Sequence, residues 1–100
     1  MTDFPLGVTE DMTAEEALQF TIDFLGTSPD DSMLCAAALT IGEPLVDRHW
    51  EAIEQDFLTL LAQRADVRRM VSCCNFDDRV PELVRERFYS YVTPEDDIGR

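Results

Sequence analysis

Residues 28–42 read SPDDSMLCAAALTIG, and this stretch decides the expected fold. Ser28 is a favoured helix N-cap, and Pro29 suits the first helical turn, where its missing N–H costs nothing. The Asp30-Asp31 pair then faces the positive end of the helix dipole. The residues that follow are nearly all apolar, so this helix should lie at the centre of the fold, and Gly42 should end it.

Another helix is predicted just before this stretch. Thr13 and Glu16 have the three-residue spacing of a capping box, in which each side chain accepts a hydrogen bond from the other residue's backbone N–H. Apolar residues at helical spacing follow as far as Leu25. Gly26 then predicts a C-terminal stop in the left-handed conformation.

The chain after Gly42 continues the helical pattern in two steps. A proline start at Glu43-Pro44 predicts one or two helical turns over residues 43–48. From Trp50 onward, apolar residues recur at helical spacing with acidic residues between them, which predicts an amphipathic helix over 50–64.

The last third of the chain should add two more helices. Asp66 can cap a segment whose apolar positions recur as far as Cys74. Residues 75–78 are a predicted loop, because Asn and Asp favour turns, and Pro81 opens the final helix. The side chains expected to point inward from that helix are Leu83, Val84, Phe88, Tyr91 and Val92.

These segments together predict an all-α protein, a compact bundle of about five antiparallel helices joined by short connections. No stretch of four or more residues alternates like a strand, and no hairpin turn signal is present. A short stack of α-hairpins of the HEAT type is the alternative. Residues 1–100 should form a single helical domain with flexible ends at 1–10 and 94–100.

The composition is strongly acidic, with a formal charge of −13 from 21 acidic residues and eight arginines. Such a chain is not expected to bind nucleic-acid phosphates or anionic membranes, since both interactions need an excess of lysine and arginine. Lysine is absent altogether, which excludes a phosphate-binding P-loop and Schiff-base chemistry. The charge favours a basic protein partner, or merely solubility.

The charges are unevenly distributed along the chain. Residues 1–47 hold ten acidic residues and no basic one, whereas residues 48–100 hold eleven acidic residues and all eight arginines. This asymmetry predicts an acidic face that attracts a cationic partner; the alternative is a solvated surface that reflects the composition of the host proteome. The expected partner-binding residues are Glu15, Glu16, Asp23, Asp30, Asp31, Glu43, Asp47 and, where it is exposed, Trp50.

Histidine and cysteine are the other reactive residue types. His49 is the only histidine, and Cys35, Cys73 and Cys74 are odd in number and fit no disulfide framework or zinc spacing. We expect the cysteines to pack in the core. A Cys35–His49 nucleophile pair and redox sensing at Cys73 and Cys74 are minor alternatives. We therefore predict no catalytic residue, no cofactor and no metal site.

The location follows from what the sequence lacks. No positive segment followed by an apolar stretch, as in a signal peptide, is present at the start. The longest apolar run falls far short of the roughly 20 residues of a membrane span. A reducing cytoplasm is the expected compartment.

The order of features over about residues 29–92 resembles a small bacterial all-helical family of unknown function. The shared elements follow the alanine-rich helix; they are Gly42-Glu43-Pro44-Leu45, Arg48-His49, Ala65-Asp66-Val67-Arg68-Arg69 and the closing Pro81-Glu82 helix. Trp50 stands where that family has a glycine. The resemblance implies a helical fold and carries no catalytic residue over to this chain.

The leading functional hypothesis is a non-enzymatic, acidic protein-binding module. It would neutralise a basic, nucleic-acid-binding or nuclease-like protein, as immunity proteins, antitoxins and phage-encoded inhibitors do, without touching nucleic acid itself. The alternative is a structural or assembly module that forms a helical homo-oligomer, a homodimer being the simplest form.

Overall fold

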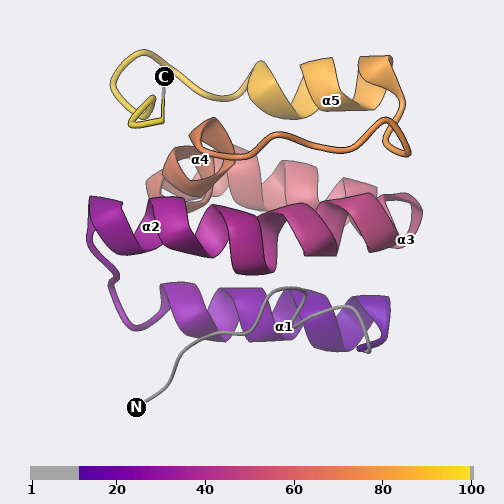
Figure 1. The fold of residues 1–100 in the computed structure, drawn as a ribbon, viewed down its shortest axis with the longest axis horizontal. Coiled ribbons are helices and arrows are strands. Elements are labelled where there is room, and N and C mark those ends of the chain that lie inside the picture. Colours follow the sequence, from indigo (N-terminus) through magenta and orange to yellow (C-terminus); the bar gives the residue numbers. More distant parts are fainter. Residues whose placement is uncertain (1–11, 100) are drawn as a thin grey trace.

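A computed structural model describes residues 12–99, and every regular element among them is helical (Figure 1). The all-α prediction is confirmed. The elements are α1 Ala14–Leu25, α2 Asp31–Ala37, the π-helical turn η1 Ala38–Gly42, α3 Glu43–Gln63, α4 Ala65–Ser72 and α5 Glu82–Tyr89.

The described residues form four helices rather than about five, because α2, η1 and α3 follow one another without a break. The prediction that Gly42 ends a helix is wrong, since its backbone is right-handed helical (φ −66°, ψ −50°). The Glu43 N–H donates to the Ala38 carbonyl, five residues earlier. A proline within a helix removes a hydrogen bond and crowds the preceding turn. The wider π turn just before Pro44 accommodates the proline and lets the helix continue.

The run from Asp31 to Gln63 bends back on itself. A straight helix of this length would measure about 50 Å, whereas the longest dimension of the protein is 35 Å. In Figure 1 the ribbon crosses the molecule and returns behind itself on the way to α4. As a result α1 packs against α3, while α2, η1 and α5 all contact α4.

The first connection follows a different capping scheme from the one predicted. The capping box of Thr13 and Glu16 is present, with both hydrogen bonds formed. Gly26 is right-handed, however, and the left-handed residue is Ser28 at φ 58°. The N-cap of α2 is Asp30, whose carboxylate accepts the Met33 N–H at 2.9 Å. Both expectations, a left-handed Gly26 and an N-cap at Ser28, are therefore wrong, because the short Asp30 carboxylate takes the cap two residues later.

The apolar core is built around the run that contains α2 and η1, as the sequence predicts. Leu34, Ala38, Ile41 and Leu45 are fully inaccessible to solvent. Phe57 of α3 and Phe88 of α5 add an edge-to-face aromatic contact, with ring centroids 5.0 Å apart. Helices distant in sequence are thus joined through one continuous core.

The last described segment lies against α4. Asp96 is buried, and its carboxylate accepts from the Arg68 guanidinium at 2.7 Å. The Ile98 N–H donates to the Ser72 hydroxyl at 3.1 Å. A Cβ at Gly99 would stand 2.7 Å from the Cys73 Cα, so only glycine fits this close approach. Residues 94–99, expected to be a flexible end, make these contacts, whereas the other expected flexible end, 1–10, lies outside the described residues.

The cysteines are arranged differently from the expectation. Cys35 of α2 and Cys73 after α4 form a disulfide, with Cα atoms 5.3 Å apart and a sequence separation of 38. The prediction that all three cysteines pack as free thiols is wrong for this pair, because the contact of α2 with α4 brings distant positions together. Cys74 is free and buried, as expected.

The last helix begins after Pro81, as predicted, but Leu83 does not point inward. Its side chain is 74% exposed, whereas Val84 and Phe88 are buried. Leu83 lies beside the buried position Val84, on the solvent-facing side of the short helix α5.

Two alanine variants of α5 test this orientation. Phe88→Ala should lower the free energy of unfolding by about 3–5 kcal/mol, because it removes a fully buried ring and leaves a cavity. Leu83→Ala should change it by no more than about 0.5 kcal/mol, because the leucine is already in water. Urea unfolding of both variants beside the wild type provides the measurement, and equal losses would contradict the orientation of α5.

Candidate protein-binding surface

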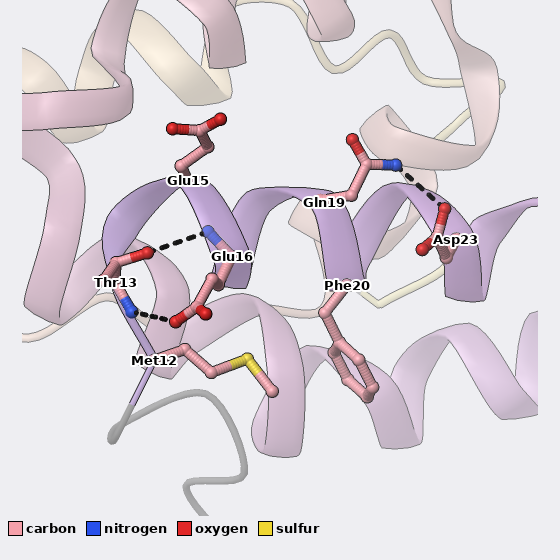
Figure 2. Close-up of a pocket in the computed structure, with 7 residues that line it drawn as sticks. All are labelled: Met12, Thr13, Glu15, Glu16, Gln19, Phe20 and Asp23. Carbon is pink, nitrogen blue, oxygen red and sulfur yellow. Dashed lines mark hydrogen bonds between the residues drawn. The ribbon is translucent and has the colours of Figure 1, made fainter.

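The outer side of α1 carries an open groove with a volume of about 740 Å³. Figure 2 shows the described residues that line it. They are Met12, Thr13, Glu15, Glu16, Gln19, Phe20 and Asp23. Three of the eight expected partner-binding residues, Glu15, Glu16 and Asp23, are therefore brought together here.

The polar side chains of α1 have a regular spacing. Glu15, Gln19 and Asp23 are four residues apart, so they lie along one face of the helix. The Gln19 amide donates to the Asp23 carboxylate at 2.9 Å. Figure 2 shows Glu15 and Gln19 pointing away from one side of α1, and Met12 and Phe20 from the other. Gln19, Met12 and Phe20 were not predicted, although the four-residue spacing of Glu15 and Asp23 about Gln19 could have revealed Gln19.

No arginine among residues 12–99 forms an ion pair with a carboxylate of α1. The six arginines between residues 64 and 87 instead pair with acidic residues elsewhere. The pairs are Arg64–Asp66, Arg68–Asp96, Arg69–Asp31, Arg79–Asp77, Arg85–Asp78 and Arg87–Glu54. The negative charge of α1 is therefore not neutralised by the described part of the chain.

The aspartates at the start of α2 are separate from this groove. Asp30 is the N-cap, so one of its carboxylate oxygens already accepts a backbone hydrogen bond. Asp31 is exposed and lies 3.6 Å from the Arg69 guanidinium. Exposed pairs of this kind contribute little to stability. Because its side chain is exposed, the Asp31 carboxylate remains accessible to a partner.

Glu43 and Asp47 have a structural role that the sequence did not indicate. They lie one turn apart on α3, and each accepts a backbone N–H of the loop after α4, from Asn75 and Asp77 respectively, both at 2.8 Å. Partial burial raises the pKa of Glu43 and the pKa of Asp47 above their usual values. These two carboxylates hold a loop, so they are less suited to binding a partner than those of α1.

Trp50, the expected aromatic contact, is partly buried and packs against the core. Its neighbour His49 has a buried Nε2 atom without a hydrogen-bond partner in the described residues. Neither residue lines the groove on α1.

The described residues contain no group of three or more His, Cys, Asp or Glu side chains placed to hold a metal ion. Between Met12 and Gly99, no helix combines the length and the apolar character needed to cross a membrane.

Comparison with models of known protein families, with characterised proteins and with solved structures finds no match to this chain.

Two variants of Glu43 separate its hydrogen bond from its charge. Glu43→Gln should be at least as stable as the wild type at about pH 7, because the amide oxygen can still accept the Asn75 N–H and no charge is partly buried. Glu43→Ala should lower the free energy of unfolding by about 1 kcal/mol, because the acceptor is lost. Urea unfolding measures both.

The stability difference between Glu43→Gln and the wild type should depend on pH. Folding raises the pKa of Glu43, so the folded state binds protons more readily than the unfolded state, and the wild type gains stability as the pH falls through that pKa. The advantage of Glu43→Gln should therefore be largest at neutral pH and shrink below about pH 4.5. An advantage that grows on acidification would show that Glu43 is needed in its charged form.

Proposed function

We propose that this protein is a non-enzymatic binding module that neutralises a basic protein partner, in the manner of an inhibitor, immunity protein or antitoxin. The observation that carries the proposal is the set of α1 carboxylates, Glu15, Glu16 and Asp23, which line one groove and have no described cation beside them. Such a surface attracts a cationic partner over a distance and raises its association rate.

The ion pairs elsewhere in the fold support this assignment. Four of the arginines pair with acidic residues on α3, on α4 and in the loop between α4 and α5, so the charges of these pairs are compensated. The carboxylates of α1 belong to none of these ion pairs and share one groove, with Asp31 as an accessible neighbour in sequence. A basic cleft that normally binds nucleic acid would be a complementary partner surface, because its lysines and arginines would replace the absent cations.

A second candidate function is self-association as a structural module. The observation that favours it is apolar exposure on α2 and η1, where Met33 is 48% and Leu39 is 56% exposed. No charged residue occurs between positions 32 and 42, so two copies could approach there with little repulsion. Sedimentation of the protein alone distinguishes the candidates, because a stable dimer favours assembly and a monomer favours binding to another protein.

A charge-matched pair of triple variants tests the binding function. Glu15→Gln/Glu16→Gln/Asp23→Asn should bind an arginine-rich peptide at least about tenfold more weakly than the wild type at low salt. Glutamine at position 16 can keep the capping box, so α1 should remain folded. The control, Glu51→Gln/Asp56→Asn/Glu82→Gln, removes the same charge from exposed positions that form none of the observed ion pairs. It should bind within about threefold of the wild type.

Titration calorimetry over about 50 to 500 mM salt completes this test. The affinity of the wild type should fall as the salt concentration rises, because the interaction is electrostatic. Equal losses for the two triple variants would mean that only net charge matters, and an affinity independent of salt would refute electrostatic recognition.

A further inference from the structure

The cysteines form two chemically distinct groups. Cys35 and Cys73 form the disulfide and are both partly exposed. Cys74 is completely buried, and its Sγ lies 3.4 Å from the Met70 carbonyl oxygen. Burial raises the pKa of the Cys74 thiol well above its usual value, so this thiol is poorly suited to attack the neighbouring disulfide. The two residues of the bridge are thus partly exposed to solvent and to an external thiol, whereas the free thiol is buried.

The first turn of the helix that this bridge restrains is weakly held by other contacts. Only Leu34 and Ala37 are buried in α2, and its first turn is exposed. The ion pair that also joins α2 to α4, Asp31–Arg69, is exposed and long at 3.6 Å. Such a pair adds at most a small stabilisation. Beside the buried Leu34, the disulfide is therefore the main restraint on the first turns of α2.

The next part of the same run is more completely buried. In η1, Ala38 and Ile41 are fully buried. A Cβ at Gly42 would lie 3.1 Å from the Cys74 Sγ, which shows how closely η1 approaches the end of α4. The helical hydrogen bonding changes from α to π at Ala38, between the less buried and the more buried part of the run.

We propose that the Cys35–Cys73 disulfide is a redox-sensitive restraint, and that its reduction releases α2 as far as η1 while the rest of the core stays folded. A dithiol reductant attacks one sulfur of the bridge to form a mixed disulfide, and its second thiolate then displaces the bound cysteine. The bridge S–S bond breaks and the reductant's S–S bond forms. Two electrons and two protons pass to Cys35 and Cys73, which become thiols.

The consequence for binding rests on the proposed function. The loop 26–30 joins α1 directly to α2, so release of α2 would loosen the end of α1 that carries Asp23, while the packing of α1 on α3 remains. Reduction would then weaken the binding of a cationic partner. The structural part of the proposal can be tested without any partner.

Hydrogen exchange of the oxidised protein and of the protein reduced with dithiothreitol is the experiment. The amides of residues 34–37 should exchange at least about tenfold faster after reduction, while those of residues 57–61 in α3 keep their rates. Equal acceleration in both segments would mean that the bridge only stabilises the whole fold. Unchanged exchange in α2 would mean that it restrains nothing, and either result would overturn the proposal.

Peptide mapping and two variants complete the design. Mapping of the oxidised protein should find Cys35 joined to Cys73 and alkylate Cys74 only after unfolding; any other pairing would overturn the proposal. Cys35→Ser should show fast exchange in α2 with or without reductant. Cys74→Ala, which keeps the bridge, should retain the wild-type response. The wild-type comparison needs no substitution, so it remains decisive even where a variant fails to fold.

Discussion

The close approach of η1 to α4 is the contact on which the rest of the structure depends. Small residues, Ala38 and Gly42, allow the π turn to lie against Met70 and Cys74. This packing brings Cys35 within bonding distance of Cys73. A larger side chain at Gly42 would force Cys74 or Met70 to move, because protein cores are close-packed and have little free volume.

The same contact explains why the acidic residues of the first half have different roles. It places the start of α3 beside the loop after α4, where Glu43 and Asp47 accept backbone N–H groups. Most of α1 lies away from this region and packs on α3, so Glu15 and Asp23 remain available on the surface, as does Glu16 beside its capping hydrogen bond to the Thr13 N–H. A backbone N–H is a strong hydrogen-bond partner for a carboxylate. The acidic residues of the first half therefore differ in role according to whether the fold places a backbone N–H beside them.

The ion pairs of the described arginines do not include the carboxylates of α1. The arginines occur only after residue 47, and three of them pair with acidic residues of α4 and of the loop between α4 and α5. Arg87 and Arg69 reach across to Glu54 and Asp31, respectively, on the long helical run. None reaches a carboxylate of α1 in the described chain, so the asymmetry of the sequence is preserved in three dimensions as an uncompensated surface.

The sequence by itself determined the helical class, the capping box of Thr13 and Glu16, the start of α5 after Pro81 and the central position of the apolar stretch from Leu34 to Ile41. These features depend on local hydrogen bonding and on the periodicity of apolar residues, which neighbouring positions specify. Only the tertiary structure decided that the helix continues through Gly42, that Cys35 pairs with Cys73 and that Glu43 and Asp47 hold a loop. Each of the last two outcomes depends on a contact between residues about 30 or more positions apart. At Gly42 the deciding factor was the π turn, whose wider hydrogen bonding overrides the usual preferences of glycine and proline.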